Sequence, residues 1–311
     1  MLPTPNVGEA AQLLRQLVPS DAAFLDAPRP FAAVAAPGAK RARGTAPTLL
    51  INGCGRSGTH ALVMLLRRHG IAALHEGHGR EATVGWPYVG YLEGNWKEYW
   101  PMSNQPRGSG DVHDPIFKVH RHPLSAIRSI APGLTSSGAC RNPSERRWDA
   151  RAWRCASRFI SLPVPQAAVQ AQETCGLSRD ARRRLALHYW VKWNLLADRW
   201  AAHSFAVETV TAADLLGRWC AHCTAPRACQ CPATAAQLLA TLARNESNGS
   251  GSGGASADAN DRVRARKGHG ASARRPRPPL SWADLESLDP NMTMVAQRLA
   301  LEYGYSLAPQ R

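Results

Sequence analysis

The sequence has no long apolar run and few cysteines, and each absence excludes a class of protein. No stretch of about 18 consecutive apolar residues occurs, so no transmembrane helix is predicted. The first residues do not combine a basic start with an apolar core, so no secretory signal is visible. Eight cysteines in 311 residues are too sparse for a disulfide scaffold. We therefore expect a soluble protein, with the cytoplasm as the favoured compartment.

Acidic residues are in the minority. The chain has 23 Asp and Glu against 38 Lys and Arg, a formal net charge of +15, which suggests an anionic partner. Helix-turn-helix, zinc-finger and RNA-binding signatures are missing, so nucleic acid is not the expected partner. A hydrophobic fraction of 44% over 311 residues is enough to bury the core of one large α/β domain or two small ones.

One stretch in the N-terminal third of the chain has the pattern of an anion-binding turn. Residues 48–52 are apolar or β-favouring, residues 53–58 are glycine-rich, and a helical pattern with one apolar face follows over residues 59–69. A strand, a glycine-rich turn and a helix N-terminus direct free backbone N–H groups and the positive end of the helix dipole to one point. A βα turn without a ligand is the alternative.

The same turn lacks the residues that phosphoryl transfer needs. Gly53 and Gly58 have the G-x-x-x-x-G spacing of a nucleotide-triphosphate loop, but Thr59 and His60 replace the Lys-Ser/Thr pair that should follow. That lysine reaches the β- and γ-phosphates and that hydroxyl holds Mg²⁺, so a kinase or NTPase is disfavoured. The turn can still hold one terminal phosphate or phosphosulfate.

The sequence GCGRSGTH, residues 53–60, resembles the 5′-phosphosulfate loop of sulfotransferases, which use 3′-phosphoadenosine 5′-phosphosulfate (PAPS) as sulfuryl donor. Residues 115–131, PIFKVHRHPLSAIRSIA, are similar to that family's second signature. In this signature a buried strand ends in Arg (Arg121), a turn with Pro (Pro123) follows, and a Ser (Ser129) lies eight residues beyond the Arg. The resemblance implies a P-loop-type three-layer α/β fold with a central parallel sheet, one domain over residues 47–311.

The resemblance also implies a set of donor-binding residues and their roles. Arg56 would stabilise charge on the sulfuryl group and the departing 5′-phosphate, and Arg121 with Ser129 would hold the 3′-phosphate. No metal is needed for this chemistry. A non-catalytic relative that binds adenosine 3′,5′-bisphosphate (PAP) and a P-loop small-molecule kinase are the alternatives. The implied donor site consists of Gly53, Gly55, Arg56, Ser57, Gly58, Thr59, His60, Arg121 and Ser129, with His60 in place of the family's usual Thr.

A general base is expected after the second predicted strand, residues 71–76. The acceptor hydroxyl must lose a proton as it attacks sulfur, and His or Glu commonly takes it. Some sulfotransferase branches use a glutamate just after the second strand, and Glu76 has the matching place. His75 and His78 are rival candidates, and a solvated or structural role for Glu76 is the alternative.

The acceptor itself is not defined by the sequence. A carbohydrate or another small molecule is expected. Residues 86–100, WPYVGYLEGNWKEYW, contain six aromatic residues, which suit either a platform for a ring-bearing acceptor or the packing of a long loop.

The remaining segments complete the predicted organisation. Residues 1–46 are interpreted as an N-terminal extension or linker, and residues 245–279 as a flexible low-complexity insert. Helices are predicted over 181–202, 212–219, 281–288 and 290–303, and a buried strand over 204–209. The first of these helices has an apolar stripe at spacings of three and four, interpreted as core: Leu185, Tyr189, Trp193, Leu196 and Trp200. Ser281 and Asp289 suit the N-caps of the last two helices. Four thiols form a weak zinc candidate, against free or disulfide-linked cysteines: Cys220, Cys223, Cys229 and Cys231.

Overall fold

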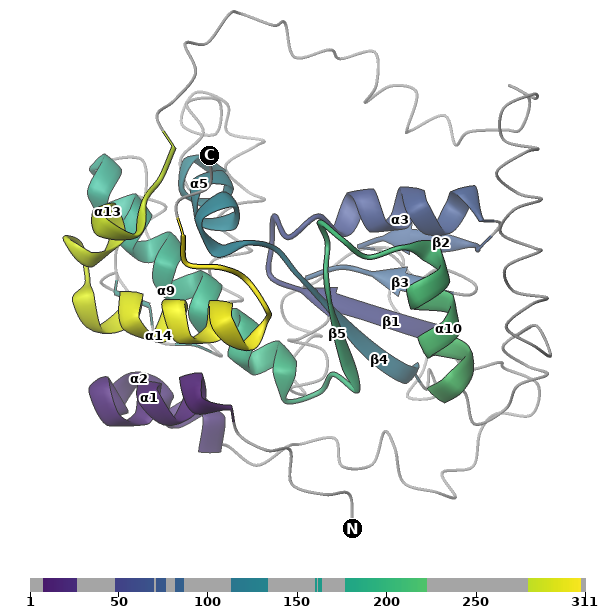
Figure 1. Ribbon diagram of the computed structural model, residues 1–311, viewed down its shortest axis with the longest axis horizontal. Helices are drawn as coiled ribbons and strands as arrows, with labels where there is room; N and C mark the ends of the chain where they lie inside the picture. The colour runs from purple at the N-terminus through teal and green to yellow at the C-terminus, as the bar shows by residue number, and fades with distance from the viewer. Residues whose placement is uncertain are drawn as a thin grey trace, which may run out of the picture.

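The computed structural model describes residues 8–26, 48–69, 71–76, 82–86, 113–133, 160, 162–163, 177–222 and 279–308. A five-stranded parallel sheet lies at its centre in the order β2-β3-β1-β4-β5 (Figure 1). The strands are β1 (Thr48–Gly53), β2 (Ala73–His75), β3 (Ala82–Val84), β4 (His113–His120) and β5 (His203–Ala206). This architecture confirms the predicted α/β class with a central parallel sheet.

Strand β1 is buried on both faces, which explains its continuous apolar sequence. Leu49 and Ile51 pack in one cluster with α3 (Thr59–Arg68) and α10 (Ala212–His222). Leu50 points the other way and packs with Ile116 and Trp200, on the side where α9 (Arg179–Asp198) contacts β1 and β4. Parallel strands covered by helices on both faces have little need of polar residues.

The second predicted strand, residues 71–76, corresponds to β2 (Ala73–His75). Strand β2 is parallel to β1 yet lies at the sheet edge, because β3 is inserted between them. The sequence pattern did not reveal β3, a strand of only three residues. The predicted strand over 204–209 corresponds to the shorter β5.

Helix α9 is the centre of the helical part of the molecule. Four residues of its predicted apolar stripe are confirmed as core, since Leu185, Tyr189, Trp193 and Leu196 are all at most 5% exposed. Trp200, the fifth, lies beyond the end of α9 and is half-buried. Helices α5 (Pro123–Gly133), α13 (Trp282–Glu286) and α14 (Pro290–Glu302) all contact it (Figure 1). A helix enclosed in this way is buried around most of its circumference.

The two C-terminal helices begin where the sequence predicts. Ser281 accepts from the Asp284 N–H and forms a capping box at the start of α13. Asp289 accepts from the Met292 N–H at the start of α14, with Pro290 at the first helical position. Both predicted N-caps are therefore confirmed.

Two helices near the N-terminus, α1 (Glu9–Leu17) and α2 (Pro19–Asp26), belong to the core. Ala10 and Leu14 are fully buried in the cluster that α9 and α14 share. The interpretation of residues 1–46 as an extension did not anticipate this packing. Residues 27–47, and the proposed insert at 245–279 except for its last residue, lie outside the described residues.

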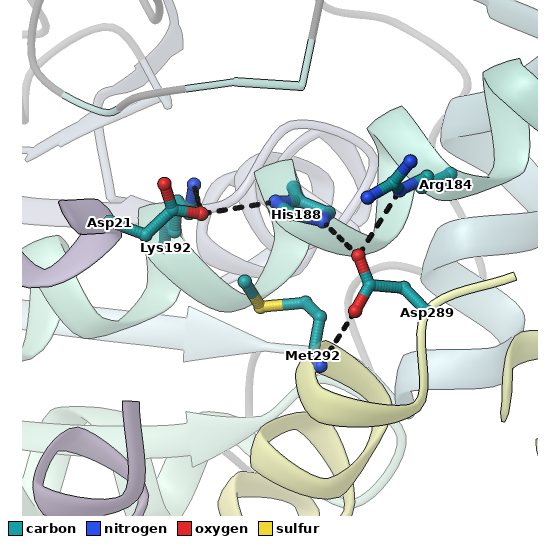
Figure 2. Close-up of polar contacts among 6 residues, drawn as sticks. All are labelled: Asp21, Arg184, His188, Lys192, Asp289 and Met292. Atoms are coloured by element: carbon teal, nitrogen blue, oxygen red, sulfur yellow. Dashed lines mark hydrogen bonds and ion pairs between the residues drawn. The ribbon is translucent and has the colours of Figure 1, made fainter. Parts of the chain in front are cut away.

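A chain of polar contacts joins α2, α9 and α14 (Figure 2). Asp21 accepts a hydrogen bond from Lys192 and lies 3.5 Å from His188 Nδ1. His188 Nε2 lies 2.8 Å from Asp289 Oδ2, and Arg184 Nε lies 3.1 Å from the same oxygen.

No helix in the described ranges is both long and apolar enough to cross a membrane.

Candidate anion-binding site

The topology brings the glycine-rich turn and the segment that begins with Arg121 to the same end of the sheet, the carboxyl ends of its strands. Strands β1 and β4 are hydrogen-bonded neighbours and parallel, so the segments that follow them emerge side by side. After β1 the chain builds β2 and β3 on one side, and β4 lies on the other. The point where the strand order changes direction is called the switch point of the sheet. Open α/β sheets bind ligands there, beyond the carboxyl ends of the strands. The glycine-rich turn and Arg121 both lie at this point.

Two glycines of the turn are required by close approach of other segments. A Cβ atom on Gly53 would lie 2.5 Å from the Val119 carbonyl oxygen of β4. Gly58 has φ +85° and a Cβ there would lie 2.5 Å from Val207 Cγ2. The turn can therefore run close to β4 and to the segment after β5 only because these side chains are absent.

The turn presents unpaired amides ahead of α3. The Gly55 N–H donates to the Tyr189 hydroxyl at 3.3 Å, and the Ser57 N–H donates to the Cys54 carbonyl at 3.1 Å. Gly58 is the N-cap of α3 without a side-chain capping bond, and the first helical bond runs from Leu62 N–H to Gly58 O. Within the described residues, four amides of the turn and the first residues of α3 have no acceptor: those of Arg56, Gly58, Thr59 and His60. An array of this kind binds anions.

The three predicted cation and hydroxyl groups converge on the turn. Arg56, which is exposed, donates from Nε to Ser129 Oγ at 3.3 Å. Arg121 donates from Nη1 to the Arg56 carbonyl oxygen at 3.5 Å. Arg56 comes from the turn after β1, Arg121 from the end of β4, and Ser129 from α5. The structure thus brings together residues up to 73 positions apart in the chain.

A third group lies beside the first turn of α3. Thr59 Oγ1 and His75 Nε2 form a hydrogen bond of 2.9 Å, and His75 Nε2 lies 3.8 Å from Glu76 Oε1. The His60 ring meets the His75 ring edge to face at 5.6 Å. If His75 donates its Nε2 proton to Thr59, the Thr59 hydroxyl keeps its own proton for a bound anion. His78, the third candidate base, lies outside the described residues.

The side chains beneath the turn are buried. Cys54 and Ser57 are fully buried, and burial raises the pKa of the Cys54 thiol far above its ordinary value. The Ser57 hydroxyl has no hydrogen-bond partner of normal geometry in the described part of the chain. Cys54 is therefore a neutral packing residue below the turn rather than a nucleophile.

Tyr189 is a residue of the site that the sequence reasoning assigned only to packing. Its ring stacks on Trp193 within the core, while its hydroxyl accepts the Gly55 N–H 134 positions away. The helical stripe predicted the buried ring, but no sequence signal tells which backbone group a tyrosine hydroxyl meets.

Trp86, the first residue of the aromatic run, packs against Trp193 at 5.6 Å, and residues 87–100 lie outside the described residues.

Only one of the four cysteines of the zinc candidate lies among the described residues. Cys220 is disulfide-bonded, and Cys223, Cys229 and Cys231 lie outside the described residues. A sulfur in a disulfide is not a thiolate ligand, so for Cys220 the structure agrees with the disulfide alternative. No cluster of three or more metal-ligating side chains occurs in the part of the chain that the structure describes.

In comparisons with protein-family models, curated proteins and solved structures, the chain has no match. Its function must therefore be inferred from the residues that meet at the sheet edge.

Proposed function

We propose that the protein is a PAPS-dependent sulfotransferase that transfers a sulfuryl group to a hydroxyl of a carbohydrate or another small molecule. One observation carries the proposal: two anion-binding elements meet at the switch point of the sheet. One is the amide array of the turn with Arg56, and the other is Arg121 with Ser129, both within 3.5 Å of Arg56 atoms. Two such elements suit a nucleotide that carries one anionic group on the 5′ oxygen and another on the 3′ oxygen of its ribose.

The donor's 5′-phosphosulfate would bind to the unpaired amides and Arg56, and its 3′-phosphate to Arg121 and Ser129. The acceptor oxygen forms a bond to sulfur while the bond from sulfur to the 5′-phosphate oxygen breaks. The electron pair of that bond stays on the departing phosphate, whose charge Arg56 and the amides stabilise. The products are a sulfate ester and PAP.

Glu76 is the proposed general base that takes the acceptor proton. It follows β2 at the same edge of the sheet, and its carboxylate lies 3.8 Å from His75. His75 is already hydrogen-bonded to Thr59, so we assign it the role of holding the Thr59 hydroxyl toward the 5′-phosphate. His60 supplies its backbone amide, and its side chain packs on His75.

The proposal is tested by the effect of PAP on thermal stability. At a concentration about 100 times its Kd, PAP should stabilise the folded protein by about 2.7 kcal/mol, and ATP with Mg²⁺ by much less. Arg121→Ala should weaken this stabilisation strongly, because it removes one of the two anion elements. Arg68→Ala is the matched control, since Arg68 is exposed at the far end of α3 and carries the same charge.

Two results would contradict the proposal. No stabilisation of the wild-type protein by PAP would exclude the donor site, and an unchanged shift in Arg121→Ala would exclude the second anion element. A screen of hydroxyl acceptors with labelled PAPS then separates an enzyme from a non-catalytic PAP-binding protein.

A further inference from the structure

A chain of hydrogen bonds outside the proposed donor contacts links the segment after α14 to the end of β4. Tyr305, three residues after α14, donates from its hydroxyl to Glu208 Oε2 at 2.9 Å. His120 Nδ1 lies 3.0 Å from the same hydroxyl oxygen. A tyrosine has one proton to donate, so His120 must donate its Nδ1 proton to Tyr305. Three segments, ending β4, following β5 and following α14, are joined in this way.

The same chain returns to the backbone just beyond Arg121. Glu208 Oε1 accepts from the His122 N–H at 2.8 Å. The His122 ring meets the Tyr305 ring edge to face at 5.1 Å, and the His120 ring stacks on Tyr303 at 4.2 Å. Arg121 therefore lies between His120, whose ring is hydrogen-bonded to Tyr305, and His122, whose backbone N–H is bonded to Glu208, the acceptor of the Tyr305 hydroxyl.

The surroundings keep these groups in fixed protonation states near neutral pH. His120 and His122 are 3% and 4% exposed, and burial lowers the pKa of both, that of His120 to about 3. Burial, with Glu208 nearby, raises the pKa of Tyr305 well above its usual range, and the charge of Arg121 acts in the opposite direction. Tyr305 thus remains a hydroxyl donor, and Arg121 lies close enough to influence it.

We propose that Tyr305 is a positioning residue that fixes the turn of residues 120–122, so that Arg121 meets the 3′-phosphate of the nucleotide. The proposal rests on the proposed function, because it assigns Arg121 that ligand. An arginine held by ordered neighbours loses less freedom on binding, and a small displacement of its guanidinium weakens a charge-assisted bond. The expected signature is a loss confined to ligands that carry the 3′-phosphate.

The test compares two ligands that differ only in that group. Affinities for PAP and for adenosine 5′-monophosphate (AMP) are measured by calorimetry at one salt concentration, and their ratio is taken for each variant. Tyr305→Phe should lower the PAP/AMP ratio by about 2- to 10-fold, the range expected for loss of a hydrogen bond, with AMP affinity unchanged within twofold. This substitution leaves the charge of the site as it was.

Tyr303→Phe is the matched control. Its hydroxyl donates to Asp198 Oδ2 and accepts from Lys118, so its loss should reduce stability without changing the PAP/AMP ratio. If both phenylalanine variants lower the ratio equally, or if Tyr305→Phe leaves it unchanged in a folded protein, the positioning role is refuted. If the wild-type protein does not prefer PAP over AMP, the proposed function itself fails.

A second variant decides the question should Tyr305→Phe not fold. Glu208 is exposed, so Glu208→Ala should preserve the fold while it removes the acceptor of both Tyr305 and the His122 N–H. By charge alone, loss of this carboxylate would raise the affinity for a 3′-phosphate. We expect the PAP/AMP ratio to fall instead, and an unchanged or higher ratio would overturn the proposal.

Discussion

At the scale of single residues, backbone conformation sets two candidate site residues apart. In the described ranges Arg56 (φ 68°) and Glu76 (φ 54°) are the non-glycine residues with positive φ. This region is uncommon for residues with long side chains and costs free energy unless the surroundings enforce it. Both residues follow strands at the same edge of the sheet. The folded chain thus tolerates unfavourable conformations at two of the residues that the sequence singles out as candidate site residues.

His120 gives a prediction for pH dependence. Burial lowers the pKa of His120 to about 3, whereas an unfolded histidine has a pKa of about 6.5. Below pH 6.5 the unfolded chain binds a proton there that the folded protein does not, so the free energy of unfolding falls as the pH falls toward 3. At pH 4.5 this contribution is about 2–3 kcal/mol.

Urea denaturation between pH 7 and pH 4.5 measures this effect against His120→Gln, whose amide can still donate to Tyr305. The variant should lose less stability over this interval than the wild-type protein. Equal slopes in the two proteins would show that His120 is not the neutral buried histidine described above.

At the scale of elements, the unit formed by β1, the glycine-rich turn and α3 depends on contact with the segment after β5. Gly58→Ala should lower the free energy of unfolding by at least about 1–2 kcal/mol, the cost of a left-handed conformation for a residue with Cβ. The contact with Val207 should add to that cost, because a Cβ at this position would lie 2.5 Å from Val207 Cγ2.

Gly304 offers a control of the same backbone type. Its φ is +79°, but a Cβ there would have nothing within 4 Å, so Gly304→Ala carries the conformational cost alone. In a Val207→Ala background the cost of Gly58→Ala should shrink toward that of Gly304→Ala. The same cost in both backgrounds would mean that Val207 is not the obstacle.

At the scale of the whole molecule, the N-terminal helices are bound to the rest by a buried ion pair (Figure 2). The Lys192 side chain is fully buried and its ammonium group donates to Asp21, whose side chain is 15% exposed. Asp21→Ala removes that carboxylate from a buried ammonium, and such changes cost about 3–5 kcal/mol. Chemical denaturation of the whole chain should show this loss as a shift of a single transition.

Two further variants separate a buried pair from a surface pair. Asp26→Ala breaks the ion pair with Arg15, where the aspartate side chain is 65% exposed, and should cost less than about 1 kcal/mol. Asp21→Ala combined with Lys192→Met removes both charges and should recover most of the loss. A loss below 1 kcal/mol in Asp21→Ala would show that α2 is not tied to the core by this pair.

Features with local causes were predictable from the sequence. The strand and turn of residues 48–58, the strand that ends before Arg121, and the caps at Ser281 and Asp289 each follow from a pattern within a few residues. Apolar runs, glycine spacing and capping side chains act within a few residues, so the local sequence is enough to predict the elements that they form. The parallel α/β class follows from the alternation of these strands with helices.

What only the tertiary structure decided are the contacts between distant segments. Strand β3 has three residues and forms because β1 and β2 flank it, and α1 is a core helix because α14 covers it. The hydroxyls of Tyr189 and Tyr305 find partners 134 and 185 positions away. Periodicity predicts that such side chains are buried, but the group that each meets depends on how the elements pack in three dimensions. The residue types of the site were therefore readable in the sequence, and the resemblance implied that they meet, but which atoms contact one another at the carboxyl ends of β1 and β4 was decided only by the tertiary packing.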